Sequence, residues 1–361
     1  MVHEWLLDFA GSERVVREML AVFPQADLFA LIDRPDEELR AAIPRRARGT
    51  SFLQFLPRPR QWLQYYVPLM PLAVRQLDVS GYDVVISSSH AAAKGVITGE
   101  NQLHVSYVHT PMRYAWDLRD VYLRAAGLDR GVRGWAARLV LERLRRWDER
   151  SARGVDVLLA NSAHVAERIR RAYGREAEVL YPPVDTDAFP LRADKEDFYL
   201  TVSRLQAYKR VDLLVAAFAR MPGRRLVVVG EGPEGARLRG VAPSNVEFLG
   251  RLPTARVVDY MQRARAFLFA GIEDFGIVMA EAQACGTPLI TLGKGGAAEI
   301  VRDDTGVLFA EQSAGAVTEA VERFDASGSF SPTRCRENAM RFDRARFRQR
   351  LAALLPAPLT A

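Results

Sequence analysis

Short runs of apolar residues alternate with longer amphipathic stretches along the whole chain. The clearest apolar runs span residues 82–89, 104–110, 155–162, 197–204, 225–232, 246–251, 266–271 and 288–293. Strands that are apolar at almost every position are typical of parallel sheets covered by helices on both faces. Ligands bind such sheets at the carboxyl ends of the strands. The residues at the ends of the runs are therefore candidate site residues: His109, Asn161, Arg204, Gly230 and Glu273.

The pattern divides the chain into two predicted domains. A stretch with three prolines, residues 181–195, interrupts the apolar runs, which start again after it. We therefore predict an α/β domain from residue 1 to 183 and a second from 184 to 341, facing each other across a cleft. Residues 342–361 are predicted to form an amphipathic helix that returns to the first domain. The run at residues 2–7 is short for a first strand, so either that strand is very short or its beginning is missing.

Composition narrows the class of ligand only slightly. The 361 residues suit about two domains, and 50 basic residues against 44 acidic ones leave a net charge of +6. A mild positive charge favours phosphate ligands or an anionic membrane surface over a long nucleic-acid track. Cys285 and Cys335 are too few for a disulfide framework. The chain shows no signal peptide and no apolar stretch of about 20 residues, so we expect a cytoplasmic protein that can contact a membrane.

A glycine motif ends the run at 225–232. Gly230, Gly232 and Gly235 have the G-x-G-x-x-G spacing of dinucleotide-binding turns. Pro233 removes a backbone amide that a pyrophosphate would use, and no acidic residue ends the next predicted strand. We therefore interpret the motif as a tight strand-to-helix turn, which in its functional version also borders a nucleotide base.

Two cations follow the run at 197–204. Arg204 ends the predicted strand, and Lys209 comes five residues later, near the start of a predicted helix. Positive charges beside the free amides of a helix N-terminus form a good diphosphate clamp. A solvated basic turn is the alternative, and the position at a strand end favours ligand contact.

Glu273 and Glu281 stand eight residues apart around an apolar segment. The pattern predicts a loop from 271 to 274 and a helix from about Phe275 to Cys285. The two carboxylates would be about 80° out of register on a helix. They therefore suit two separate contacts along one extended ligand better than an acid/base pair. An acidic cluster that stabilises the helix dipole would account for Glu273 but not for Glu281.

Two further segments concern the surface. Residues 52–72 interleave aromatic residues, arginines and prolines. Either they form an irregular helix packed on the first domain, or they form an interfacial segment that meets a lipid-linked substrate. The predicted helix at 133–153 is basic on one face, which suits either solvent or phospholipid head groups.

Motifs over almost the whole chain resemble a known family. In the second half they are Glu273-x7-Glu281, SRLxxxKR at 203–210, GEGPE at 230–234 and FLGR at 248–251. In the first half they are VHEWLLDFAGSERV at 2–15, LDVSGYDVVISSSHAAAKGV at 77–96, HTPMRYAWD at 109–117 and YPPVDTDAF at 181–189. Together they resemble the retaining glycosyltransferases of family 4, which have the GT-B fold of two Rossmann-like domains. Within that family the first half is similar to bacterial GDP-mannose-dependent mannosyltransferases of O-antigen and exopolysaccharide assembly.

The resemblance implies roles for residues of the donor site. It assigns the donor diphosphate to Arg204 and Lys209, the donor-sugar hydroxyls to Glu273 and the ribose to Glu281. The remaining implied donor-binding residues are Gly11, Gly230, Gly232, Arg251, Asp274, Phe275, Gly276 and Ile277. Members often have two glycines where this chain has Ala10-Gly11, so at Ala10 the chain departs from the pattern that would bring Gly11 to the phosphates or the acceptor.

The resemblance also implies a role for His109. A lone histidine at a strand end is more often structural, but here it matches the histidine that the family places near the reacting sugar. His109, Glu273, Arg204 and Lys209 are therefore the predicted catalytic set. The residues implied on the acceptor side are Ser12, Arg113, Tyr114 and Trp116.

The implied reaction is transfer of a hexose, most simply mannose from GDP-mannose, to a lipid-linked saccharide at the inner face of the cytoplasmic membrane. Cations and helix amides would stabilise the leaving phosphate in place of a metal. The sequence has no Asp-x-Asp pair at a strand end and no His/Cys cluster, so we expect neither a metal nor a cofactor.

Other interpretations keep the fold and change the activity. The donor could carry UDP or ADP, or the chain could be a sugar epimerase or phosphorylase. A phosphorylase would need a pyridoxal-binding lysine, and the chain has only four lysines. A catalytically weakened partner of a polysaccharide assembly complex is the non-enzymatic alternative, and the intact cations and glutamates of the predicted donor site argue against it.

Overall fold

The chain folds into two compact α/β units. The computed structural model describes residues 1–117, 119–328 and 330–355. The first unit contains Met1–Tyr181 and the chain from Phe347 onward, and the second contains Pro182–Arg346. The division lies close to the predicted boundary at residue 183.

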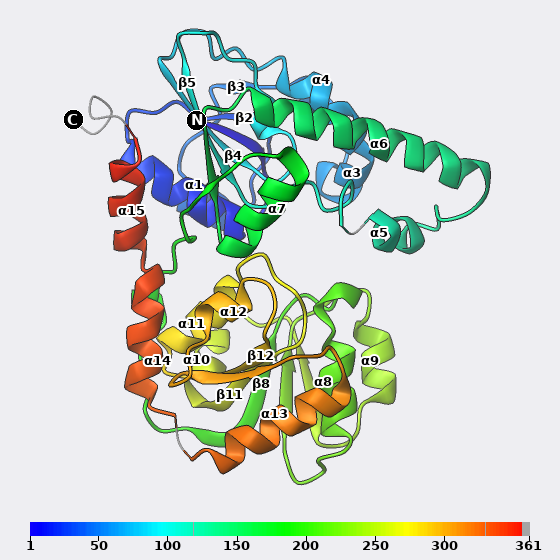
Figure 1. Ribbon diagram of the computed structural model, residues 1–361, viewed down its shortest axis with the longest axis vertical. Helices are drawn as coiled ribbons and strands as arrows, with labels where there is room; N and C mark the ends of the chain where they lie inside the picture. The colour runs from blue at the N-terminus through cyan, green and yellow to red at the C-terminus, as the bar shows by residue number, and fades with distance from the viewer. Residues whose placement is uncertain (118, 329, 356–361) are drawn as a thin grey trace. The chain divides into compact units, whose positions relative to one another are not determined.

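A parallel sheet of seven strands forms the centre of the first unit (Figure 1). Its strands are β1 (Val2–Leu6), β2 (Phe29–Asp33), β3 (Gly49–Thr50), β4 (Val84–Ser89), β5 (Leu103–Val108), β6 (Val157–Ala160) and β7 (Glu178–Val179). Its helices are α1 (Gly11–Val22), α2 (Glu37–Ala42), α3 (Pro59–Tyr66), α4 (Met70–Val74), α5 (Arg119–Ala125), α6 (Gly131–Arg153) and α7 (Ala163–Tyr173). Short 3₁₀ turns are η1 (Phe52–Phe55), η2 (Val67–Leu69) and η3 (Ala93–Gly95).

A second parallel sheet, of six strands, forms the centre of the second unit. Its strands are β8 (Glu196–Val202), β9 (Leu226–Val229), β10 (Val246–Gly250), β11 (Ala264–Phe269), β12 (Leu289–Leu292) and β13 (Gly306–Phe309). Its helices are α8 (Val211–Phe218), α9 (Gly235–Val241), α10 (Thr254–Arg263), α11 (Ile277–Ala284), α12 (Ala297–Ile300), α13 (Ala314–Ala326) and α14 (Pro332–Ala339). The 3₁₀ turns are η4 (Thr186–Ala188), η5 (Ala207–Lys209) and η6 (Met340–Phe342).

Both sheets have the strand order of a doubly wound fold. The orders are β3-β2-β1-β4-β5-β6-β7 and β10-β9-β8-β11-β12-β13. In each sheet the chain first winds toward one edge and then crosses back to build the other. The direction reverses between β1 and β4 in the first sheet and between β8 and β11 in the second. Ligands of doubly wound sheets bind outside the strand ends at this switch point.

Burial on both faces explains the continuous apolar runs. Successive residues of a strand point to opposite faces of the sheet. Val85 and Ile86, which are neighbours in β4, accordingly belong to different hydrophobic clusters. Because helices cover both clusters, neither face of the strand tolerates an alternating polar pattern. The predicted class of two parallel-sheet domains is confirmed by this arrangement.

The apolar runs left four strands unpredicted. They are β2, β3, β7 and β13. Two of them, β3 and β7, have only two residues each, which is too short for a recognisable pattern. In the structure β1 has five residues and pairs with both β2 and β4.

The segment at 52–72 forms irregular helical turns on the first unit. η1, α3, η2 and α4 follow one another, interrupted by prolines. Tyr66, Met70 and Val74 point inward and are buried in a cluster with Val2 of β1. Packing on the first domain, the first of the two interpretations, is therefore observed for one side of this segment.

The C-terminal helix α15 (Arg344–Ala353) starts in the second unit and continues into the first. It begins at Arg344 rather than at the predicted residue 342, because residues 340–342 form η6. Arg348 pairs with the buried carboxylate of Glu18 on α1 at 2.5 Å. Phe347 lies edge-on to Tyr107 of β5, with ring centres 6.1 Å apart. Across the described residues, no helix is both long and apolar enough to cross a membrane.

Two glycines bring the turns after β8 and β9 into contact. Gly230 has a φ of +133°, and a Cβ there would lie 1.9 Å from the carbonyl oxygen of Ser203. A Cβ on Gly232 would lie 2.4 Å from the carbonyl oxygen of Leu205. Only glycine permits this approach, and the amide of Leu205 in turn donates to the carbonyl of Glu231. The steric need supports the interpretation of the glycine motif as a tight turn.

We expect Gly230→Ala to destabilise the second unit. The unfavourable φ alone should lower the free energy of unfolding by about 1–3 kcal/mol. The direct clash should add to that loss. Thermal or urea unfolding measures the loss. Gly223→Ala is the matched control, because a Cβ at that position would have no other atom within 4 Å. Equal stability of the two variants would contradict this account of the turn.

Candidate functional site

The loops at the carboxyl ends of four adjacent strands carry the candidate donor site in the second unit. In sheet order these loops follow β9, β8, β11 and β12. They contain Gly230, the cations Arg204 and Lys209, Glu273, and a glycine-rich loop at 293–296. Parallel strands end at one edge of a sheet, so residues far apart in sequence meet there.

Lys209 and Glu273 form an ion pair across the switch point between β8 and β11. Both side chains are only 14% exposed. The ammonium also lies 5.1 Å from the ring centre of Tyr208 and 5.7 Å from that of Phe269. Sequence analysis assigned Lys209 to a diphosphate and Glu273 to sugar hydroxyls. The structure places the two groups in direct contact, so that each neutralises the other before any ligand binds.

Arg204 stands apart from this pair. Its side chain is exposed, and within residues 1–117, 119–328 and 330–355 its guanidinium makes no hydrogen bond or ion pair. Arg251, after β10, is exposed as well. A charged group without a protein partner at a strand end is available to an anionic ligand.

Helix α11 starts later than predicted. Its first residue is Ile277, and Phe275 and Gly276 belong to the preceding loop. Gly276 caps the helix with a φ of +96°. Phe275 is buried against Phe342, with ring centres 5.1 Å apart. Asp274 and Gly276 are half-buried in the same loop.

Glu281 lies in the buried middle of α11 and is 6% exposed. Glu273 is in the loop before the helix, so the two carboxylates occupy different elements, as predicted. A buried carboxylate needs compensating donors, and this one has protein contacts of its own.

The loop between β12 and α12 was not among the predicted site residues. The amide of Gly296 donates to the carbonyl of Glu273 at 2.8 Å. Lys294, in the same loop, is exposed. This loop therefore supports the backbone of Glu273 and adds a cation to the same edge. The signal was present in the sequence, since a Gly-Lys-Gly-Gly run follows a predicted strand.

The first unit carries a separate group of polar residues at its own switch point. Glu4 on β1 is fully buried, and one of its oxygens accepts four hydrogen bonds from the end of β4. The donors are the hydroxyl of Ser89 and the amides of His90, Ala91 and Ala93, at 2.8–3.1 Å. Its other oxygen lies 3.1 Å from Nδ1 of His90. Glu4 therefore fixes the turn after β4.

A second chain of contacts joins His109 to the turn at Gly11. Nε2 of His109 lies 2.8 Å from Oγ of Ser88, which lies 3.2 Å from Nδ1 of His3. Nε2 of His3 lies 3.1 Å from Glu13. The other carboxylate oxygen of Glu13 accepts from the amide of Ala10 and the hydroxyl of Ser12. Gly11, Ser12 and His109 are therefore brought together, through three residues that sequence analysis did not select.

Burial and charge set the protonation states of this group. Burial, with the nearby His90 and His3, lowers the pKa of His109 to about 3, so it is neutral at pH 7. Burial also opposes charge on His3, but its contacts with Glu13 and Glu4 outweigh that effect and raise its pKa. Burial would raise the pKa of Glu13, but His3 lowers it overall. The first unit thus holds a buried His3–Glu13 ion pair beside a neutral His109.

The backbone of His109 is held as firmly as its side chain. Its amide donates to the carbonyl of Ser89 at 2.8 Å. Its carbonyl accepts from Nδ2 of Asn161, the residue that follows β6, at 2.9 Å. Asn161, selected as a strand-end candidate, thereby fixes the neighbouring strand end.

Three of the four predicted acceptor-side residues, Arg113, Tyr114 and Trp116, lie on the loop after β5, whereas Ser12 lies in α1. Nε1 of Trp116 donates to the buried Asp148 of α6 at 2.9 Å, and Tyr173 donates to the same carboxylate at 2.8 Å. Lys94 completes this cluster through an ion pair with Asp148. Trp116 is therefore a structural anchor of the loop. Arg113 and Tyr114 are half-buried beside it.

Tyr114 differs from Trp116. Its hydroxyl oxygen is buried and has no hydrogen-bond partner among the described residues. Burial, with the negative charge of Asp148, raises the pKa of Tyr114 well above its usual value. A buried hydroxyl without a partner is a rare feature, and of the loop's predicted residues this one most needs a ligand or water.

Metal-binding geometry is not found in the part of the chain that the structure describes, where no three His, Cys, Asp or Glu side chains are grouped to hold an ion.

Two family models match the chain. Glycosyltransferase Family 4 matches residues 9–188, and Glycosyl transferases group 1 matches residues 185–342. D-inositol 3-phosphate glycosyltransferase of Mycobacteroides abscessus is 34% identical over 182 residues, which are 42% of this chain and 40% of that protein. Its counterpart in Mycobacterium bovis is 30% identical over 196 residues, which are 46% of this chain and 40% of that protein. The matched region thus spans about two fifths of these relatives.

Solved structures match over nearly the whole chain. Alr3699/HepE of Anabaena, in complex with UDP and glucose, has a TM-score of 0.70 at 18% identity and covers 99% of both chains. Sucrose-phosphate synthase of Thermosynechococcus elongatus has a TM-score of 0.71 at 17% identity and covers 98% of both chains. At this identity the likeness establishes the fold. The two family models together match residues 9–342, so the chain is a glycosyltransferase with a Glycosyltransferase Family 4 region followed by a Glycosyl transferases group 1 region, and its two doubly wound sheets form the GT-B fold.

Proposed function

We propose that the chain is a retaining hexosyltransferase that moves mannose from GDP-mannose onto a lipid-linked saccharide in surface polysaccharide synthesis. The part of this proposal that concerns the nucleotide-sugar donor rests on the Lys209–Glu273 pair at the switch point of the second unit. The choice of mannose and GDP rests on the resemblance of the first-half motifs to GDP-mannose enzymes.

The ion pair offers one group to each end of a nucleotide sugar. Lys209 can donate to the diphosphate, and Glu273 can accept hydrogen bonds from sugar hydroxyls. Exposed Arg204 adds a second positive charge. Before the donor binds, the pair keeps either charge from being buried alone, which would be unfavourable at 14% exposure.

The reaction follows from where charge develops. The bond between the anomeric carbon and the phosphate oxygen breaks, and its electron pair goes to the leaving diphosphate. The acceptor oxygen bonds to the anomeric carbon on the same face, and its proton passes to a departing phosphate oxygen. Arg204 and Lys209 stabilise the growing negative charge, so the reaction needs neither a metal nor a dedicated nucleophile.

A second donor is the main alternative. The Anabaena structures that share the fold contain UDP or UDP-glucose, which favours a uridine donor for this chain as well. The inositol phosphate relatives suggest a soluble phosphorylated acceptor in place of a lipid. A catalytically weakened partner of an assembly complex would bind a nucleotide without transferring a sugar.

The proposal of a lipid-linked acceptor rests on one surface of the first unit, which we call the apolar face. It is formed by exposed side chains of η1, α3, η2 and α4: Phe55, Trp62, Tyr65, Leu69 and Leu72, which are 37–81% exposed. Between Glu38 and Asp78 the chain has seven arginines and no acidic residue. Aromatic side chains beside arginines are typical of segments that lie in a membrane interface.

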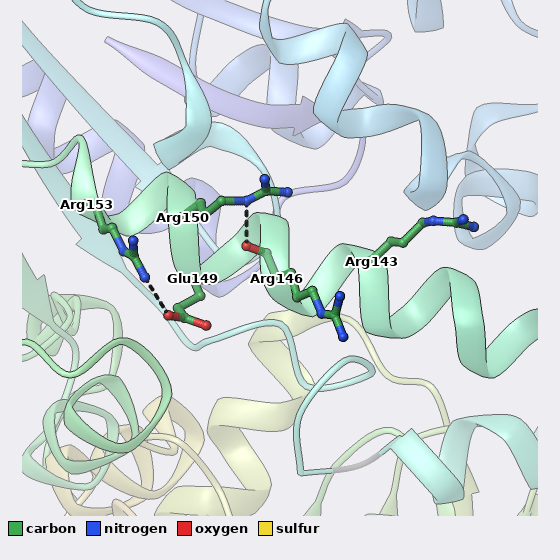
Figure 2. Close-up of a pocket in the computed structure, with 5 residues that line it drawn as sticks. All are labelled: Arg143, Arg146, Glu149, Arg150 and Arg153. Atoms are coloured by element: carbon green, nitrogen blue, oxygen red, sulfur yellow. Dashed lines mark hydrogen bonds and ion pairs between the residues drawn. The ribbon is translucent and has the colours of Figure 1, made fainter.

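Helix α6 extends this surface. Its N-terminal half exposes Val132, Trp135 and Leu139, at positions that share one side of the helix. η2 and α5 both lie against α6 (Figure 1). The C-terminal half carries four arginines that line an open pocket, shown in Figure 2: Arg143, Arg146, Arg150 and Arg153. We propose that these residues bind the phosphates of the lipid carrier or its surrounding head groups.

We expect GDP to raise the melting temperature more than UDP or ADP. A ligand that binds only the folded state stabilises it by about 2.7 kcal/mol at 100 times its Kd. Differential scanning fluorimetry with the three nucleotides measures this, and EDTA should leave the shifts unchanged. A larger shift with UDP would mean that the donor carries uracil and not guanine. A requirement for metal would contradict the proposal that Arg204 and Lys209 alone stabilise the leaving diphosphate.

Glu273→Gln should lower turnover far more than nucleotide affinity. The substitution removes the negative charge and replaces one of the two carboxylate acceptors by an NH2 donor, but it touches neither base nor ribose, so kcat should fall about 10²–10³-fold. Calorimetry with the nucleoside diphosphate should show a nearly unchanged Kd. Glu247→Gln, at an exposed pair with Arg225, is the matched control. Unchanged kcat in Glu273→Gln would reject its sugar-holding role.

Trp62→Ser combined with Tyr65→Ser should weaken binding to vesicles of anionic phosphatidylglycerol. Wild-type binding should also fall with salt, because each arginine near the surface contributes about 1 kcal/mol through electrostatics. Vesicle sedimentation measures both effects. Val241→Ser, which removes an equally exposed apolar side chain from the second unit, should bind like wild type. Wild-type protein that stays in solution at low salt would contradict the membrane proposal.

A further inference from the structure

We propose that Glu13, His3 and Ser88 order the protons around His109, so that Nδ1 of His109 carries its proton and offers it to a ligand. The three residues are positioning residues that act through His109. The catalytic consequence of this inference rests on the proposed function, whereas the proton order itself can be measured without any substrate.

The contacts form one continuous path across three elements. Glu13 on α1 contacts His3 on β1 at 3.1 Å, His3 contacts Ser88 on β4 at 3.2 Å, and Ser88 contacts His109 at 2.8 Å. His3 and Ser88 are register partners of the parallel pair β1–β4, which fixes their spacing. Both are fully buried, so water does not compete for these groups.

Counting donors along the path favours one arrangement. A charged His3 donates from both ring nitrogens. Nε2 then donates to Glu13, and Nδ1 donates to Ser88, whose carbonyl and hydroxyl oxygens both lie at 3.2 Å. The hydroxyl of Ser88 has one hydrogen. With its oxygen accepting from His3, that hydrogen is available to Nε2 of His109, which lies 2.8 Å away, and the proposal places it there.

His109 is therefore neutral, with Nε2 as acceptor and Nδ1 as donor. Among the described residues no hydrogen bond engages this Nδ1. Ser88 contacts the ring of His109. Ser89 and Asn161 hold its backbone amide and carbonyl. A fixed N–H at a strand end can donate to a sugar hydroxyl or to a phosphate oxygen.

The charges around His109 support this assignment. The titratable groups that face it are His3, His90, Glu4, Glu13 and Tyr107. Ring centres of His90 and Tyr107 lie 6.0 and 5.0 Å from that of His109. Glu4 and Glu13 are held as carboxylates, since their histidine partners lower the pKa of each despite burial. A positive charge on His3 balances Glu13 and keeps His109 from gaining a second one.

The path predicts a switch at alkaline pH. When His3 loses its proton, Nε2 keeps its hydrogen for Glu13, and Nδ1 becomes an acceptor. The hydroxyl hydrogen of Ser88 then turns toward His3. Nε2 of His109 then faces a lone pair of the Ser88 hydroxyl oxygen, which favours the tautomer of His109 with its proton on Nε2. The transition should occur above the usual histidine value of about 6.5, because the pKa of His3 is raised.

The test is nitrogen NMR of the full chain labelled in its histidine rings. The protein has only five histidines, so each signal can be assigned by single substitution. We expect His109 to show the Nδ1–H tautomer at pH 6 and to change to the Nε2–H tautomer as His3 titrates. His109 in the Nε2–H form at pH 6 would overturn the proposal.

Two variants examine the path from its two ends. Glu13→Gln removes the counter-charge of His3, so both the His3 titration and the His109 change should move to lower pH by about one to three units. Ser88→Ala should abolish the coupled change, and Ser88→Thr, which keeps a hydroxyl, should restore it. Titrations that stay in place in Glu13→Gln, or a coupled change that persists in Ser88→Ala, would each contradict the path.

Ser87→Ala is the matched control. Ser87 is the neighbour of Ser88 on β4, equally buried, and its hydroxyl contacts Nε2 of His104 on β5 at 2.9 Å. The substitution removes a serine–histidine bond of the same kind on the other face of the sheet. We expect the signals of His109 and His3 to be unaffected. If Ser87→Ala changes the His109 tautomer as Ser88→Ala does, the effect is general loosening of the sheet and the proposal fails.

Activity supplies an independent readout. With the nucleotide sugar identified by thermal shift, Ser88→Ala should lower kcat about 10- to 100-fold. Nucleotide affinity should remain, because the nucleotide contacts lie in the second unit. Ser88→Thr should recover most of kcat. If the NMR result is as expected but kcat is unchanged, the proton order stands and its role in sugar transfer is rejected. If wild type and all variants are inactive, the proposed function is contradicted, and the proton order is judged by NMR alone.

Discussion

Parallel pairing of the strands is the constraint on which the rest of the structure depends. It places every strand end of a sheet at one edge and requires helices over both faces. The order reverses between β1 and β4 and between β8 and β11, and each reversal is occupied by charged residues. Glu4 and the His3–Glu13 pair lie at the first, and Lys209–Glu273 lies at the second. The candidate site residues of this chain are thus concentrated at the switch points of the two sheets.

Both switch points hold charge pairs that are shielded from water. In the second unit, Lys209 and Glu273 neutralise each other at 14% exposure. In the first unit, His3 and Glu13 do so at 3% exposure or less. Such pairs contribute little net stability, because desolvation offsets their attraction. They are better understood as devices that hold groups in a defined charge state and orientation. In the proposed donor site such a pair offers a cation to a diphosphate and a carboxylate to a sugar, and at His109 it underlies the proposed proton order.

Candidate residues at the ends of apolar runs could be predicted from the sequence. Residues that matter only through their contacts with distant residues could not. Arg204, Lys209 and Glu273 follow apolar runs, and the structure places all three at one sheet edge. His3, Glu13 and Ser88 look like ordinary members of a strand or helix, and only the β1–β4 register brings them to His109. Helix α11 starts two residues later than expected because Gly276 adopts a positive φ. Trp116 was placed on the acceptor side, yet its indole is held by Asp148, 32 residues away.

The sequence by itself determined the fold class, the two-domain division and the sheet edges at which the candidate site residues lie. It could do so because continuous apolar runs and strand-end residues are local features, set by burial on both faces of a parallel sheet. Only the tertiary structure decided which of those residues meet. The pairing of Lys209 with Glu273, 64 residues apart, and of Ser88 with His3, 85 residues apart, depends on strand order and register. These arise from packing of the whole sheet, and no short stretch of sequence encodes them.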